Sequence, residues 1–448
     1  MARHRAVERK FEELRPASTI LLRMERGRLP LAITLFCSAT IAILTALRFV
    51  LMINLLSPSQ YGVLNLLTTA VNLLPMVSIL GIPLHLQRMV RTLGPRSISR
   101  GMKSGYIACA LTLMPLAIGL FILISPFANS TRELIVYTVS MTIVCQCSGI
   151  AIFSSQLVLG AGYRGSASLI MLFSNSVLTL SLLIPYLFEI ASLEAILLCW
   201  SAGCILVAIF VTIFAITLTG RTGPDDQLNA IMERGELELV PLFRSGILTI
   251  PSMVGPWLLV FIIRYMLGMS LGTTAVAAYA VASTIVDTAF LLASSIISFS
   301  GNRLLDRSQS PTIPFLWSGL VLTCLAIPAT VVVPFILSEI GREGYVLSNS
   351  LVVLLYVSAL CRLYITSWRQ RSLAENALGF LSGLFIIVTL CVLLILIVWK
   401  PPSPVYYALI QSSSYFFVAV GQQLITSKRG KSSPKSTAPQ GTVAERAT

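Results

Sequence analysis

Four charged side chains lie inside long apolar stretches of this chain: Arg48, Arg264, Asp287 and Arg362. A charge near the centre of a bilayer costs ~2.5–3.5 kcal/mol on insertion scales, so such residues usually face a partner or a polar cavity. Arginine keeps its charge and binds phosphate oxygens through two parallel hydrogen bonds. Arg48 and Arg264, if they face each other across a cleft, could therefore form a clamp for an anionic group.

The three arginines differ in depth. Arg48 and Arg264 each lie about 18 residues into an outward-running stretch, which at 1.5 Å per residue reaches the outer half of a bilayer. Either side chain alone could instead extend to the outer interface. Arg362 lies about five residues from the cytoplasmic end of its stretch, which favours extension to that interface. It is the third candidate for the anion clamp.

Asp287 lies near the middle of its stretch and cannot reach either interface. Its carboxylate could pair with an arginine, or it could bind H⁺ or Na⁺ in a coupling cycle. Counting along the two helices places Arg264 and Asp287 about 12 Å apart in depth. This separation argues against a direct pair between them.

Uncharged polar residues are weaker candidates for the lining of a cavity, because hydrogen bonding between helices is their usual role. The candidates are Asn65, Asn72, Gln146, Tyr61 and Tyr279.

Signs of catalysis or metal binding are missing from the sequence. It has no Gly-x-x-x-x-Gly-Lys-Ser/Thr loop, no His-Glu-x-x-His motif and only two histidines. Of these, His85 beside Arg88 is better explained as an interfacial residue. Cys145 and Cys147 are two residues apart and point to different faces of a helix. We therefore predict no enzymatic activity, no metal site and no cofactor.

The composition indicates what must position these residues. Of the 448 residues, 56% are hydrophobic and 11% are charged, against about 25% charged in soluble domains. This excludes a soluble or a disordered protein. Runs of about 20 apolar residues predict spanning helices. Twelve are expected, near 31–56, 62–84, 105–127, 134–160, 167–188, 195–219, 246–268, 274–299, 313–337, 347–367, 377–399 and 405–426.

The distribution of positive charge predicts the orientation. The N-terminal segment, the even-numbered loops and the C-terminal tail hold 26 Lys and Arg, whereas the odd-numbered loops hold three, Arg132, Arg342 and Lys400. Positive residues favour the cytoplasmic side, so both termini are predicted to be cytoplasmic. The net charge of +14 is then mainly a signal of topology, and no nucleic-acid partner is expected.

An internal repeat divides the chain. A shift of 216 residues places Arg48 on Arg264 and Gln146 on Arg362, and a shift of 218 places Tyr61 on Tyr279. Two six-helix units of the same orientation would be related by an axis along the membrane normal. The expected parts are a basic N-terminal segment (1–30), two six-helix bundles (31–219 and 246–426), a cytoplasmic linker (220–245) and a disordered cytoplasmic tail (427–448).

The first hairpin resembles that of a known family. Arg48, the run Leu56-Ser57-Pro58-Ser59-Gln60-Tyr61-Gly62 and then Leu80-Gly81 are similar to the polysaccharide (O-antigen type) flippases of the multidrug/oligosaccharidyl-lipid/polysaccharide (MOP) exporter superfamily. Arg264 and Ala278-Tyr279-Ala280 repeat the pattern. The resemblance implies an all-α, V-shaped transporter of about 12 transmembrane helices in two six-helix bundles, a MATE-like fold.

The resemblance also implies a cargo and a location. The cargo would be an undecaprenyl-diphosphate-linked oligosaccharide, moved across the bacterial cytoplasmic membrane by ion-driven alternating access. Membrane lipids and other polysaccharide assembly proteins would be its partners. Two alternatives remain: a drug/cation antiporter of the same superfamily, and a membrane polysaccharide polymerase or ligase. The last is disfavoured because such enzymes typically carry a large outer loop, whereas the outer loops here are short.

Overall fold

The computed structural model describes residues 29–79, 90, 97–219, 239–304, 310–339, 345, 348–374 and 378–432. His85, the N-terminal segment up to residue 28, most of the expected linker and the tail beyond residue 432 lie outside these ranges. The described part contains helices and no strand. Its twelve long helices are α3 (Leu29–Leu55), α4 (Pro58–Ser78), α6 (Ser97–Ile124), α7 (Thr131–Gly160), α8 (Arg164–Leu180), α10 (Leu193–Thr219), α12 (Leu239–Leu271), α13 (Thr273–Leu304), α14 (Thr312–Glu339), α15 (Asn349–Ala374), α16 (Leu378–Val398) and α17 (Pro404–Ser432).

Ten of these twelve helices are long and apolar enough to cross a membrane. The two others, α4 and α17, carry more polar side chains, among them Asn65, Thr69 and Asn72 on α4 and Gln411 and Gln422 on α17. Both lie where the sequence predicts a span, so the all-α fold of about twelve helices is confirmed. Their polar side chains matter because several of them bind other helices inside the protein.

Helix ends follow local signals. Ser57 caps α4 by accepting a hydrogen bond from the backbone of Gln60, whose own side chain binds back to the Ser57 backbone, and Pro58 opens the helix. The fifth long helix, α8, ends at Leu180 and is followed by the short α9 (Leu183–Leu187). The seventh long helix, α12, begins at Leu239, ahead of the expected start at residue 246.

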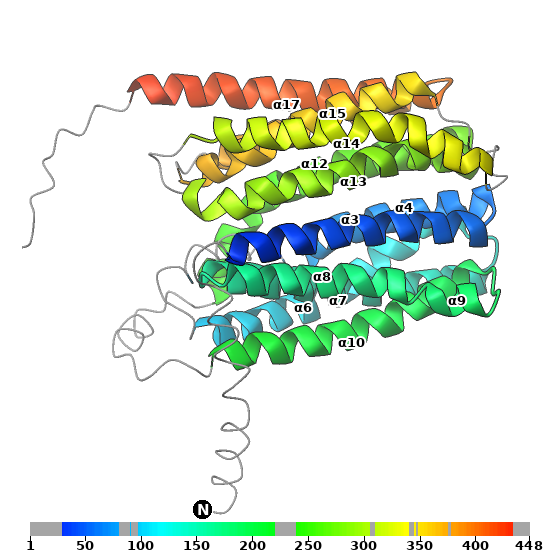
Figure 1. Cartoon of the computed structure of the whole chain (residues 1–448), viewed down its shortest axis with the longest axis horizontal. Helices are drawn as coiled ribbons and strands as arrows, with labels where there is room; N and C mark the ends of the chain where they lie inside the picture. The colour runs from blue at the N-terminus through cyan, green and yellow to red at the C-terminus, as the bar shows by residue number, and fades with distance from the viewer. Residues whose placement is uncertain are drawn as a thin grey trace, which may run out of the picture.

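The helices form two bundles of six, which lie one beside the other in Figure 1. The same neighbours recur in both: α3 packs on α8 as α12 packs on α16, α7 packs on α10 as α15 packs on α17, and α4 packs on α7 as α13 packs on α15. This recurrence is what a parallel repeat of six helices requires.

The bundles meet through α3 and α4 on one side and α12 and α13 on the other. Their contact is close at the end where α4 and α13 begin, which we call the Gly62 end. A Cβ atom placed on Gly62 would lie 1.9 Å from the carbonyl oxygen of Thr273, so only glycine lets these backbones approach. Beside it, the hydroxyls of Ser59 and Thr273 are 2.7 Å apart.

Aromatic rings also join the bundles at the Gly62 end. Tyr61 packs edge-on against Tyr345 with ring centroids 5.9 Å apart, and Phe127 packs edge-on against Tyr265 at 5.4 Å. The two bundles are therefore in contact at this end through backbone, hydroxyl and aromatic groups.

Candidate functional site

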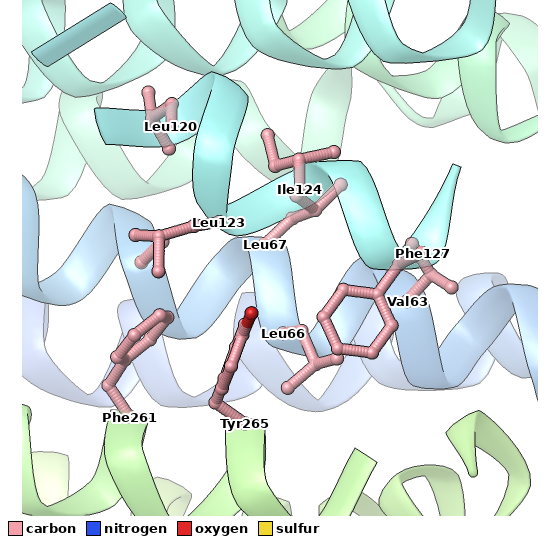
Figure 2. Close-up of a pocket in the computed structure, with 10 residues that line it drawn as sticks. Val63, Leu66, Leu67, Leu120, Leu123, Ile124, Phe127, Phe261 and Tyr265 are labelled. Carbon is pink, nitrogen blue, oxygen red and sulfur yellow. The ribbon is translucent and has the colours of Figure 1, made fainter. Parts of the chain in front are cut away.

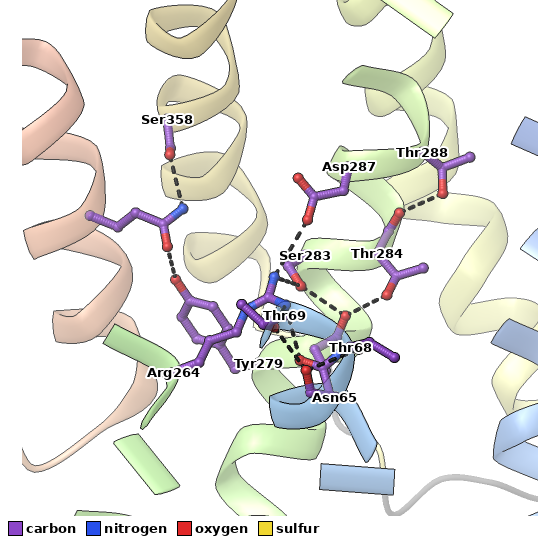
Figure 3. Close-up of polar contacts among 12 residues, drawn as sticks. Asn65, Thr68, Thr69, Arg264, Tyr279, Ser283, Thr284, Asp287, Thr288 and Ser358 are labelled. Atoms are coloured by element: carbon purple, nitrogen blue, oxygen red, sulfur yellow. Dashed lines mark hydrogen bonds and ion pairs between the residues drawn. The ribbon is translucent and has the colours of Figure 1, made fainter. Parts of the chain in front are cut away.

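Arg264, on α12, is the centre of a buried polar cluster between the bundles (Figure 3). Its Nη1 donates to Asn65 Oδ1 at 3.0 Å and to Thr69 Oγ1 at 2.8 Å, both on α4. Its Nη2 donates to Ser283 Oγ at 2.8 Å and contacts Asp287 Oδ2 at 3.4 Å, both on α13. One guanidinium thus joins a helix of the first bundle to a helix of the second.

The partners of Arg264 are related by the internal repeat. The 218-residue shift that places Tyr61 on Tyr279 also places Asn65 on Ser283 and Thr69 on Asp287. Each Nη atom of Arg264 therefore binds the equivalent pair of positions in one of the two bundles. This guanidinium lies between α4 and α13, where the two repeats meet.

Arg362, on α15, belongs to the same cluster. Its Nη1 donates to Asp287 Oδ1 at 2.8 Å, and its Cζ lies 4.8 Å from the ring centroid of Trp257 and 4.2 Å from that of Phe290. The residue is 5% exposed. The expectation that Arg362 extends to the cytoplasmic interface is wrong, because a carboxylate and two rings inside the protein hold its charge.

Arg264 and Asp287 form the ion pair that the depth estimate disfavoured. A count of residues along the helix axes gives the separation of the Cα atoms and not the direction of the side chains. Side chains lean toward the N-terminus of their own helix. Because α12 and α13 run in opposite directions through the connecting turn at Gly272, the two side chains lean toward each other. A long arginine then covers the remaining separation.

The cluster carries an excess of positive charge. Two arginines share one carboxylate, and each oxygen of Asp287 contacts a different guanidinium. The side chains of Arg264 and Arg362 are 8% and 5% exposed, whereas that of Asp287 is 33% exposed. The carboxylate is therefore the accessible member of a group whose formal charge is +1.

Arg48 lies near this cluster without joining it. It is partly buried on α3, and it forms no ion pair with the described residues. The phenol of Tyr61 lies within electrostatic range of both Arg48 and Arg264. Arg362, and not Arg48, takes the place beside Asp287 and Arg264.

Tyr279 connects the cluster to two more helices. Its ring centroid lies 5.8 Å from the Cζ of Arg264, and its hydroxyl donates to Gln411 Oε1 at 2.8 Å. Gln411 in turn donates to Ser358 Oγ at 2.9 Å (Figure 3). This chain of buried contacts links α13, α17 and α15. Tyr279 therefore connects Arg264 to these helices.

Two expected cavity residues lie apart from the cluster. Asn72 is exposed on α4. Gln146 is buried on α7, and neither atom of its amide has a hydrogen-bond partner in the described part of the chain. Sequence analysis missed Thr69, Ser283, Trp257 and Phe290. The 218-residue shift was a signal for two of them, because it places Thr69 on Asp287 and Asn65 on Ser283.

No metal-binding group competes with this cluster in the described residues. They contain no gathering of three His, Cys, Asp or Glu that could hold a metal ion. A pocket between α4, α6 and α12 is lined by apolar and aromatic side chains, including Leu66, Phe127, Phe261 and Tyr265 (Figure 2). It contains no charged group and does not suit an ionic ligand.

Comparisons with known proteins identify the fold. No family model and no curated protein sequence matches this chain. Among solved structures, a MATE transporter in complex with MaD5 gives a TM-score of 0.60 at 12% identity, covering 92% of this chain and 98% of the other. An outward-facing multidrug resistance MATE family transporter of the MOP superfamily gives 0.59 at 13%, covering 92% and 99%. A MOP superfamily transporter from Pyrococcus furiosus, described as having a binding pocket of reverse polarity, gives 0.58 at 13%, covering 91% and 97%. The chain has the fold of the MATE transporters of the MOP superfamily.

Proposed function

We propose that this protein is a multi-pass membrane transporter whose cargo is an anionic, lipid-linked oligosaccharide. The cargo bears a diphosphate on an undecaprenyl chain and crosses the bacterial cytoplasmic membrane. The termini lie in the cytoplasm. The positive-charge bias of the loops supports this orientation, and the fold supports transport.

One observation carries the choice of cargo: two buried arginines share a single carboxylate. A cationic drug would meet a net positive cluster, whereas a diphosphate would meet guanidinium groups suited to its oxygens. Arg48, on α3 of the first bundle, adds a further positive charge.

The contact between bundles supports alternating access. In the proposed orientation the Gly62 end faces outward, so the contacts at Gly62, Ser59 and Tyr61 close the outer side. Outward opening then requires α4 and α13 to separate. This separation would break the bonds from Arg264 to Asn65 and Thr69 on α4, because these two bonds cross the interface between the bundles.

A drug/cation antiporter is the second candidate function. The match to multidrug resistance MATE structures favours it, as does the partial exposure of Asp287. Against it, each carboxylate oxygen of Asp287 already contacts an arginine. A cation would have to displace a guanidinium from each side.

Binding in lipid nanodiscs separates the two functions. Undecaprenyl-diphosphate-linked oligosaccharide should bind the wild-type protein, and the same oligosaccharide on undecaprenol should bind far more weakly. Arg264→Gln and Arg362→Gln should remove the difference. Arg132→Gln is the matched control, because this side chain is 82% exposed and lies outside the cluster. Tight binding of a lipophilic cation such as rhodamine 6G, with no preference for the diphosphate lipid, would establish the antiporter instead.

A further inference from the structure

Asp287 occupies the place where an anion would bind. Its Oδ1 accepts from Arg362 at 2.8 Å and its Oδ2 contacts Arg264 at the longer distance of 3.4 Å. Its side chain is 33% exposed, while both arginines are nearly enclosed. A ligand that approaches these guanidinium groups from the accessible side therefore meets the carboxylate first.

The two arginines keep unused hydrogen-bonding capacity. A guanidinium has five N–H donors. Within the described residues Arg362 donates to Asp287 alone, and the Nε of Arg264 is buried without a partner. The Nε and Nη2 edge of a guanidinium can bind an oxyanion with two parallel bonds. Asp287 makes a single, long contact there, so it satisfies this edge incompletely.

The repeat places a carboxylate in one bundle only. The position equivalent to Asp287 is Thr69, whose hydroxyl accepts a hydrogen bond from Nη1 of Arg264. The remaining partners of Arg264, Asn65 and Ser283, are neutral. Asp287 is thus the single acidic partner of both arginines in the described residues, and its removal changes the cluster from +1 to +2.

We propose that Asp287 is a built-in counterion that holds the anion-binding position in the empty protein and is displaced by a phosphate or diphosphate group. This inference rests on the proposed function, because it assumes that the arginines bind an anionic cargo. Two buried positive charges without a counterion are costly, so the carboxylate stabilises the empty state. Its return to the arginines then competes with bound cargo and promotes release.

Competition predicts a specific pattern in Asp287→Asn. Full-length protein in detergent is titrated with inorganic pyrophosphate at constant ionic strength, with melting temperature and calorimetry as readouts. Without pyrophosphate, Asp287→Asn should melt below the wild-type protein. Its affinity for pyrophosphate should be higher by about tenfold, a common size for coupled binding equilibria. Asp287→Glu, which restores the charge, should return the affinity toward the wild-type value.

Glu194→Gln is the matched control. It removes a carboxylate that contacts Arg132 at the same 3.4 Å, outside the cluster, and should leave pyrophosphate affinity unchanged. If Asp287→Asn folds only when pyrophosphate is present during purification, that dependence also supports displacement. In the double variants with Arg264→Gln or Arg362→Gln, the gain in affinity should disappear.

Two results would overturn the inference. Equal or weaker pyrophosphate binding by Asp287→Asn would mean that the carboxylate helps to hold the anion or only supports the arginines. A gain that survives in both double variants, with Arg264→Gln and with Arg362→Gln, would place the anion elsewhere. The proposed function fails separately, when the wild-type protein does not distinguish the diphosphate lipid from its neutral counterpart.

Discussion

Asn65 and Ser283, which occupy equivalent positions in the two repeats, bind the same guanidinium from opposite bundles. Asn65 Oδ1 accepts from Nη1 of Arg264 at 3.0 Å, and Ser283 Oγ accepts from Nη2 at 2.8 Å. A single side chain thereby makes the interface between the bundles polar at a point enclosed by apolar packing. The strength of this interface should depend on the side chains of α4 that reach across it.

Removing the α4 partners should weaken the contact between bundles. In Asn65→Ala combined with Thr69→Val, Nη1 of Arg264 loses both described acceptors. Hydrogen bonds to charged groups contribute about 1.5–3 kcal/mol each, so the melting temperature should fall by several degrees. Thr68→Val is the control, because the Thr68 hydroxyl bonds to the carbonyl of Asn65 within its own helix. A loss no larger than that of the control would contradict the bridging role.

Charge alone should not replace Arg264. Arg264→Lys keeps the positive charge. A single ammonium group cannot bind α4 and α13 at the same time, as the two Nη atoms of the guanidinium do. We expect a loss of stability of at least ~1.5–3 kcal/mol, from one charged hydrogen bond, and weaker binding of the diphosphate lipid, measured by melting and by nanodisc binding. Arg132→Lys, on the exposed side chain that contacts Glu194, should behave as wild type. Binding of the diphosphate lipid by Arg264→Lys at the wild-type level would show that the guanidinium geometry is not needed.

The fold was predictable because its signals are periodic and long. Apolar runs mark the helices, and the shared positions of Arg48 and Arg264 mark the repeat. Helix ends were harder: α12 begins at Leu239 because the helix continues past its apolar part. The sequence also shows where α4 lies but not why it is polar. In the structure, its Asn65 and Thr69 bind the buried Arg264 of the other bundle.

The three paired charges of the cluster were predictable as candidates, and their pairing was not. Arg264, Arg362 and Asp287 stand out as charges in apolar helices. Their pairing depends on the direction of the side chains, which on antiparallel helices point toward each other. A count of residues along the helix axis does not include this direction. The contacts of Arg362 with Trp257 and Phe290 join residues from three helices, and aromatic side chains in an apolar sequence give no sign of such contacts.

The rings around Arg362 should stabilise its charge. Trp257→Leu removes a ring centred 4.8 Å from its Cζ, and desolvated cation–π contacts reach ~2 kcal/mol. We expect a lower melting temperature. The same change in an Arg362→Met background should cost less, because no cation remains for the ring to contact. Trp317→Leu, on a side chain that is 59% exposed, is the control. Equal losses in both backgrounds would mean that Trp257 contributes only its packing.

The close approach at Gly62 should control how firmly the bundles meet. In Gly62→Ala the new Cβ would lie 1.9 Å from the Thr273 carbonyl oxygen, which forces the backbones of α4 and α13 apart. The readout is disulfide cross-linking of Ser59→Cys with Thr273→Cys, whose hydroxyls are 2.7 Å apart, after replacement of the nine native cysteines. Gly62→Ala should slow cross-linking and lower the melting temperature.

Gly119→Ala is the matched control for this change, because nothing lies within 4 Å of a Cβ placed there. On helix propensity alone, alanine should stabilise either helix by roughly 0.5–1 kcal/mol. A melting temperature that falls in Gly62→Ala while it holds or rises in Gly119→Ala therefore isolates the steric effect at the interface. If cross-linking is as fast in Gly62→Ala as in the parent, the two bundles tolerate a wider spacing at the Gly62 end, and the close approach of their backbones does not hold this end shut.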